Sequence, residues 1–224
     1  MRRGLILAAF FQFIALNKDM TMENIYLSPE KTATAEITEK RSRFIGNIAH
    51  VESEQEAIEF IKSIKKKYYD AKHSAYAYIT ENTKRYSDDG EPAKTAGLPI
   101  LDMLDAQGIT DCVCTVTRYF GGILLGTGGL VRAYTAAAKL ALEEAGIKKM
   151  TLHNKYKITI PYSLFDNVKY VAGESNCEIE NCQYTDVIEA DGICELNNCD
   201  LFLDNMSNAF GINVKIVFSE QIYR

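Results

Sequence analysis

The residue types that best indicate chemistry lie in one glycine-rich segment, residues 115–134, TVTRYFGGILLGTGGLVRAY. Glycine accepts positive φ values and allows other atoms to approach the backbone closely. A helix N-terminus presents unpaired N–H groups and a partial positive charge. A glycine loop that opens a helix can therefore seat a phosphate or a carboxylate, and Arg118 and Arg132 flank this one. Five of the fourteen glycines of the chain belong to the loop: Gly121, Gly122, Gly126, Gly128 and Gly129.

The glycine loop also has a purely structural interpretation. Glycines at a strand–helix junction can serve close packing, leaving space for the small residues Ala136, Ala137 and Ala138. The segment is not a P-loop, and Val131 occupies the last glycine position of the dinucleotide-binding fingerprint. Anion binding and close packing therefore both remain open.

A second segment, residues 84–97, combines acidic and basic side chains. Its acidic cluster of Asp88, Asp89 and Glu91 could bind magnesium or supply a general base. The same cluster could be a turn before Gly90. Magnesium is therefore a possible cofactor, and no other is expected. Four further side chains of the segment could add to an anion site: Lys84, Arg85, Lys94 and Thr95.

Cysteine and histidine give weaker signals. Cys112 and Cys114 alternate within an apolar run, which predicts that both point to one buried face. The other four cysteines lie in two pairs along the sequence, Cys177 with Cys182 and Cys194 with Cys199. Neither pair has the usual zinc-knuckle spacing. Reduced structural thiols are the favoured interpretation, with a metal site or disulfides as alternatives. No hydrolase, zinc-protease or kinase motif occurs, so no catalysis is expected.

Composition divides the chain into two parts. Hydrophobic residues make up 47% of it, enough for a core, and the net charge is −5. Residues 1–150 hold 20 Lys and Arg against 19 Asp and Glu, whereas residues 151–224 hold 5 against 11. A face that binds a polyanion therefore belongs to the first part, and the acidic second part suits a protein partner.

The first residues resemble a secretory signal, because Arg2 and Arg3 precede an apolar stretch from Leu5 to Leu16. A clear cleavage site is missing. We interpret residues 1–21 as a non-native or disordered extension upstream of the natural start, and expect a cytoplasmic protein.

Residue periodicity predicts an α+β fold with two domains, residues 22–150 and 151–224. In the first domain, Ser53 to Glu56 form a capping box. The expected strands and helices of that domain are strands at 32–37, 43–51, 74–80 and 111–117 and helices at 54–68, 99–107 and 130–145. The second domain is expected to have the order βαββαβ of a ferredoxin-like fold, with a turn at Asp191-Gly192 and a helix ending at Gly211.

Several of these motifs resemble those of the YigZ/IMPACT family. The central ones are RYSDDGEP at 85–92, TAG at 95–97, RYFGG at 118–122 and LGTGGLVRAY at 125–134. KRSRF at 40–44 and HSAY at 73–76 also match, and the resemblance covers about residues 22–224.

The resemblance implies more than the residues do by themselves. The first domain in that family is similar to domain IV of elongation factor G, a sheet with helices on one face, and the second to domain V. Eukaryotic relatives regulate translation by blocking activation of a kinase that phosphorylates an initiation factor, and that role depends on an additional N-terminal domain.

We therefore expect a translation-associated regulatory protein that binds RNA or a ribosomal surface. We expect it neither to catalyse a reaction nor to bind a membrane. Two alternatives remain: a metal-dependent enzyme acting on a small phosphorylated substrate, and a protein-interaction module that docks through the acidic domain. Besides Arg118 and Arg132, the expected phosphate contacts are Lys40, Arg41, Arg43, Lys84, Arg85 and Lys94.

Overall fold

The computed structural model describes residues 25–224, so the predicted N-terminal extension lies outside the described residues. The described chain divides into two compact units, Tyr26–Met150 and Thr151–Arg224. We call these the first and the second unit and describe each by itself. Both combine antiparallel strands with helices, so the prediction of an α+β fold is confirmed.

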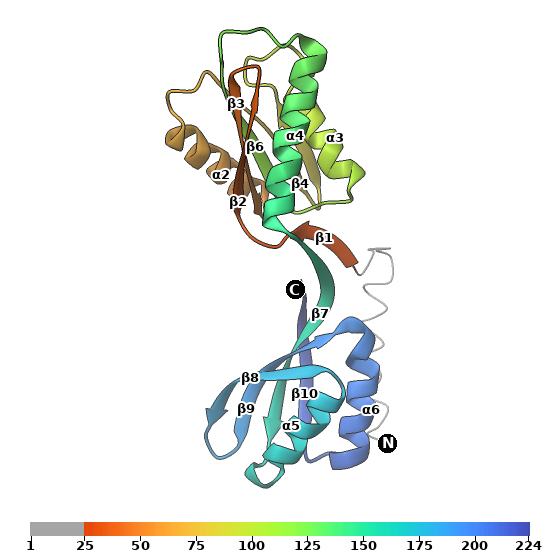
Figure 1. The fold of residues 1–224 in the computed structure, drawn as a ribbon. Helices are drawn as coiled ribbons and strands as arrows, with labels where there is room; N and C mark the ends of the chain where they lie inside the picture. The colour runs from red at the N-terminus through yellow and green to blue at the C-terminus, as the bar shows by residue number, and fades with distance from the viewer. Residues whose placement is uncertain (1–24) are drawn as a thin grey trace. The chain divides into compact units, whose positions relative to one another are not determined.

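The first unit contains a five-stranded antiparallel sheet with the order β2-β3-β6-β4-β5 (Figure 1). Its strands are β2 (Ala33–Glu39), β3 (Ser42–His50), β4 (His73–Thr80), β5 (Thr83–Ser87) and β6 (Cys112–Tyr119). A further strand, β1 (Ile25–Pro29), makes a bridge from Leu27 to Ile109. The loops that form the candidate site lie at the ends of strands β2, β3, β5 and β6.

Helices cover both faces of this sheet, which corrects the expectation of helices on one face only. Helices α3 (Gly97–Ala106) and α4 (Thr127–Ala145) pack on one face, and α2 (Glu54–Lys67) packs on the other. Strand β6 lies between them: Cys112 and Cys114 face α3 and α4, while Val113 faces α2. Both cysteines are fully buried, as predicted, and burial raises the pKa of the Cys112 thiol to about 12.

The predicted capping box is present at the start of α2. The Oγ of Ser53 accepts a hydrogen bond from the Glu56 N–H at 3.2 Å. The Glu56 carboxylate in turn accepts from the Glu52 N–H at 2.8 Å, one residue earlier than the usual partner.

The expected loop at 84–97 is wrong in its first part, because Thr83–Ser87 forms β5. This strand pairs with β4, with Arg85 opposite Tyr78 and Lys84 opposite Ile79. Its polar sequence suits the edge of the sheet, where one side of the strand lacks a neighbour. The pairing with β4 therefore decides its conformation.

The second unit has the element order βαββαβ. Its strands β7, β8, β9 and β10 form an antiparallel sheet with the order β10-β7-β9-β8, and its core lies between that sheet and two helices. The elements are β7 (Ile147–Ile160), α5 (Phe165–Glu174), β8 (Cys177–Tyr184), β9 (Ile188–Glu195), α6 (Cys199–Phe210) and β10 (Lys215–Tyr223).

The predicted turn at Asp191-Gly192 is wrong, because both residues lie inside β9. A Cβ atom on Gly192 would lie 2.1 Å from Cζ of Tyr156, so this glycine makes room for a buried ring. The predicted helix end at Gly211 is confirmed, since this residue caps α6 with a φ of 58°.

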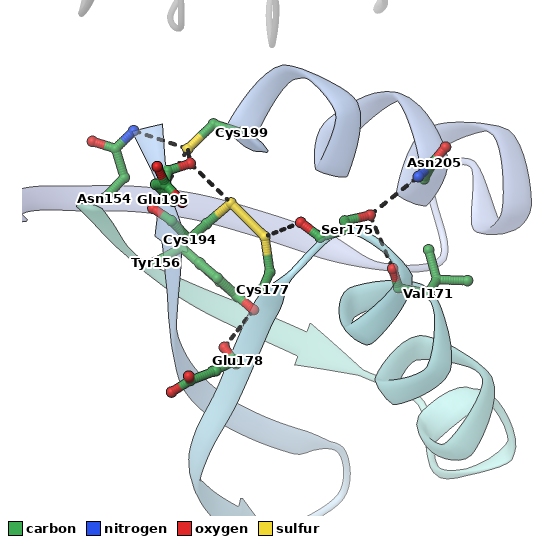
Figure 2. The surroundings of a disulfide bond; sticks show 10 residues. All are labelled: Asn154, Tyr156, Val171, Ser175, Cys177, Glu178, Cys194, Glu195, Cys199 and Asn205. Atoms are coloured by element: carbon green, nitrogen blue, oxygen red, sulfur yellow. Dashed lines mark hydrogen bonds between the residues drawn. A yellow bond between two sulfur atoms is a disulfide. The ribbon is translucent and has the colours of Figure 1, made fainter. Parts of the chain in front are cut away.

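A disulfide bond joins Cys177 to Cys194, which lie opposite each other on β8 and β9 (Figure 2). The favoured interpretation of reduced thiols is therefore wrong for this pair. The remaining cysteines, among them Cys199 beside the disulfide, are free. The Cys199 sulfur accepts a hydrogen bond from Asn154 Nδ2 at 3.1 Å.

Candidate functional site

Three segments meet at one end of the first unit, and we call them together the loop surface: residues 40–41, 88–96 and 120–129. The Gly121 N–H donates to Ser42 Oγ at 3.1 Å, and a Cβ atom on Gly121 would lie 2.0 Å from the carbonyl carbon of Arg41. Glu91 links the 88–96 segment to Arg118, at the end of β6. The structure thus brings together segments far apart in sequence.

The backbone of the loop surface is held in unusual conformations. Lys40, Arg41, Asp89 and Lys94 all have positive φ angles, between 46° and 67°. Such conformations cost non-glycine residues roughly 1–2 kcal/mol each, so they persist only where the surrounding contacts enforce them.

Helix α4 opens onto the loop surface with its N-terminus uncapped. Its N-cap residue, Gly126, offers no side chain, and the first turn contains no acidic residue. Thr127 and Gly128 are exposed, and so is Arg132, whose Nη1 lies 3.6 Å from the position of a Cβ atom on Gly128. The helix end and Arg132 therefore present positive charge to solvent.

Arg118, by contrast, is buried and ion-paired. Its Nη1 lies 2.8 Å from Oε1 of Glu91, and only 8% and 3% of the two side chains are exposed. Tyr134 donates from its hydroxyl to the same oxygen at 2.8 Å, and burial and the Glu91 carboxylate both raise the Tyr134 pKa. This corrects the expectation that Arg118 offers its charge to an external anion.

The carboxylates of Asp88 and Asp89 also form hydrogen bonds within the protein. Asp88 accepts hydrogen bonds from the Ala96 and Gly97 N–H groups, at 3.0 and 2.8 Å, and so caps the start of α3. Asp89 accepts from the Ser74 N–H at 2.7 Å and from Lys65 at 2.6 Å.

These contacts correct the expectation of a metal site at Asp88, Asp89 and Glu91. Each carboxylate is turned toward its own donors, and residues 25–224 contain no group of three or more acidic, histidine or cysteine side chains arranged to hold a metal ion. The cluster shapes the loop instead.

Three of the predicted basic residues pair with acids elsewhere on the first unit. Lys84 forms an ion pair with Asp105, and Arg85 forms one with Glu54. Arg85 stands opposite Tyr78 in the pair of β4 and β5, outside the three segments of the loop surface. Arg43 donates two hydrogen bonds to Glu36, both at 2.8 Å, and these lower the pKa of the Glu36 carboxyl.

Thr95 does not face an external anion either. It is buried, and its hydroxyl donates to the Pro92 carbonyl at 2.6 Å. The hydroxyl therefore closes a turn within the 88–96 segment.

Four cations of the loop surface and its border remain unpaired. Each is exposed, and none of their side chains forms an ion pair or hydrogen bond with any residue from 25 to 224. They are Lys40, Arg41, Lys94 and Arg132.

The glycine loop also exposes three apolar side chains that were not among the predicted site residues. Phe120 is 56% exposed, Ile123 39% and Leu124 82%. Their signal in the sequence is large apolar residues inside a glycine loop, outside any strand or helix that would bury them.

Comparisons with known proteins agree with the resemblance described above. A family model described as "Impact N-terminal domain" matches residues 40–142, which contain the whole loop surface. The chain is 33% identical over 189 residues to "IMPACT family member YvyE" of Bacillus subtilis, covering 83% of this chain and 87% of the relative. It is 34% identical over 164 residues to "IMPACT family member YigZ" of Escherichia coli, covering 71% and 80%.

A solved structure titled "Crystal structure of an hypothetical protein" is similar with a TM-score of 0.61 and 29% identity, over 89% of this chain and 99% of that one. Within residues 25–224, no helix is both long and apolar enough to cross a membrane.

Proposed function

Because this chain belongs to the IMPACT family, we propose that it is a cytoplasmic, translation-associated regulatory protein that binds RNA, free or within the ribosome, at the loop surface. One observation carries this proposal: the loop surface and its border present four unpaired cations, and one of them, Arg132, lies beside the uncapped N-terminus of α4. Phosphate groups match both features, because they accept hydrogen bonds from backbone N–H groups and pair with Lys and Arg.

The charge distribution supports the same choice of ligand. Lys65 offsets Asp89 and Arg118 offsets Glu91, so two of the nearby acids are paired with cations of the protein. The second unit, with 5 basic against 11 acidic residues, would repel a phosphate backbone. RNA contact is therefore assigned to the first unit.

The salt dependence of RNA binding tests the proposal. The affinity of the full chain for an RNA oligonucleotide should fall steeply with salt. If each of the four cations contacts a phosphate, replacing Lys40, Arg41, Lys94 and Arg132 with alanine should flatten the log–log slope by about 3. Fluorescence anisotropy between about 50 and 200 mM salt covers the useful range.

A matched control removes charges that already have partners. Replacing Lys84 and Arg85 with alanine lowers the charge without touching the loop surface, and RNA affinity should stay within about twofold of the wild type. Absence of RNA binding at about 50 mM salt, or equal losses in both variants, would contradict the proposal.

We assign the second unit to the ferredoxin-like domains, supported by its βαββαβ order and its strand order β10-β7-β9-β8. We also propose that the first unit is related to domain IV of elongation factor G. An experimental structure with another strand order in either unit would contradict the corresponding assignment.

A further inference from the structure

We infer that the RNA is bound as a single strand and that one unpaired base stacks on Phe120. This inference rests on the proposed function and adds the class of nucleic acid and the residue that selects it. It starts from an exposed aromatic side chain in the glycine loop: Phe120 is 56% exposed although it directly follows a buried strand.

The Phe120 ring is supported from within the protein. Arg118, two residues earlier in the chain, has its guanidinium carbon 5.4 Å from the centre of the Phe120 ring. The same guanidinium is paired with the buried Glu91 carboxylate and lies 5.5 Å from the centre of the buried Phe44 ring. Phe120 is therefore held by a cation that is itself fixed in the core, while much of its ring surface stays accessible.

The cations nearby match the other half of a nucleotide. The backbone of Arg41 contacts Gly121, the residue that follows Phe120. Lys94 belongs to the segment that carries Glu91, and Arg132 lies at the start of α4. An exposed ring on the same surface as unpaired cations suits a ligand that offers a flat base and a phosphate within one nucleotide.

Single strands present these two groups together and duplexes do not. In a double helix the bases are stacked on each other and the accessible outer surface consists mainly of phosphates and sugars. Unpaired bases are free to stack on aromatic side chains, with little dependence on sequence. The phosphate contacts of the proposed function alone would accept both forms, so Phe120 is the residue that distinguishes them.

The principal experiment compares two exposed apolar residues of the same loop. We expect Phe120→Ala to weaken binding of a single-stranded RNA by about tenfold or more and to leave binding of a duplex of equal length unchanged. Leu124→Ala is the matched control, because Leu124 is 82% exposed in the same loop but has no aromatic face, and it should change the affinities for the single strand and for the duplex by the same factor. Equal losses from the two substitutions would overturn the stacking inference in favour of a general apolar contact.

A second measurement reports directly on the ring position. The chain contains thirteen tyrosines but no tryptophan, so Phe120→Trp introduces a single tryptophan, whose emission can be excited selectively, and keeps an aromatic face. Single-stranded RNA should quench its emission with a saturable curve, whereas a strand of equal length that lacks bases at every position should not. Quenching by the abasic strand, or no quenching while anisotropy shows that RNA is bound, would overturn the inference.

The outcomes separate the two proposals. RNA binding that depends on the four cations but is equal for single strands and duplexes, and insensitive to Phe120→Ala, supports the proposed function and contradicts stacking. No binding of either form at about 50 mM salt contradicts both. A single-stranded DNA of the same sequence shows whether the 2′-hydroxyl contributes; the stacking inference expects Phe120→Ala to weaken DNA and RNA by the same factor.

Discussion

Arg118 and Glu91 form a charged pair inside the first unit, where each group depends on the other. Both side chains are more than nine-tenths buried, and the Tyr134 hydroxyl completes the contact. Removing one partner of such a pair leaves a buried charge without compensation, whereas removing both does not. The pair therefore serves the structure of the loop surface.

We expect Arg118→Ala and Glu91→Ala each to lower the free energy of unfolding by about 3–5 kcal/mol. The double variant should lose clearly less than the sum, because it leaves neither charge unpaired. Urea unfolding followed by circular dichroism measures all four proteins of the cycle. Additive losses would show that the two side chains contribute independently and would contradict this description.

The glycine loop is positioned by contact with a neighbouring turn as well as by its own sequence. Gly121 packs directly on the backbone of Arg41, where no side chain fits. Gly128, in the first turn of α4, has open space around it except for the end of the Arg132 side chain. The two glycines therefore have different roles although they belong to one motif.

We expect Gly121→Ala to destabilise the protein and to weaken RNA binding, because its Cβ atom would lie 2.0 Å from a backbone carbon. Gly128→Ala should be neutral or stabilising by up to about 1 kcal/mol, since alanine favours the helix. Thermal unfolding of both variants, with RNA affinity measured below the transition, checks this pair. A Gly121→Ala variant as stable as the wild type would rule out the close packing.

Each of the two units has a core of its own. One cluster around Phe44, Tyr134 and Leu142 fills the first unit, and another around Tyr156 and Phe202 fills the second. The disulfide between Cys177 and Cys194 closes a sequence separation of 17 residues within the second unit alone. Its contribution should therefore be confined to that unit.

We expect reduction of the disulfide to lower the stability of the second unit by about 3 kcal/mol, as for a cross-link of about this loop length. Hydrogen exchange followed by mass spectrometry should show faster exchange in peptides from 151–224 and no change in those from 26–150. RNA affinity should be the same with and without reductant. Faster exchange in both units, or a loss of affinity, would show that the disulfide acts beyond its own unit.

Local patterns in the sequence determined much of this protein. Apart from β1 and β5, the strand and helix order follows from side-chain periodicity and chain propensity, which act over a few residues. The same is true of the capping box at Ser53, the end of α6 at Gly211 and the burial of Cys112 and Cys114. The family motifs and the basic and glycine-rich segments were also readable there. These features need no knowledge of distant neighbours.

Only the tertiary structure decided which charges face solvent. Glu91 and Arg118 are 27 residues apart, and Asp88 caps a helix that starts nine residues later. Gly192 is a further example. Its sequence pattern predicts a turn, and only the folded structure shows that this glycine makes room for the Tyr156 ring. A charged side chain has the same sequence signal whether it is paired or free, because its partner is chosen by packing. The four unpaired cations could therefore be identified only after the chain had folded around them.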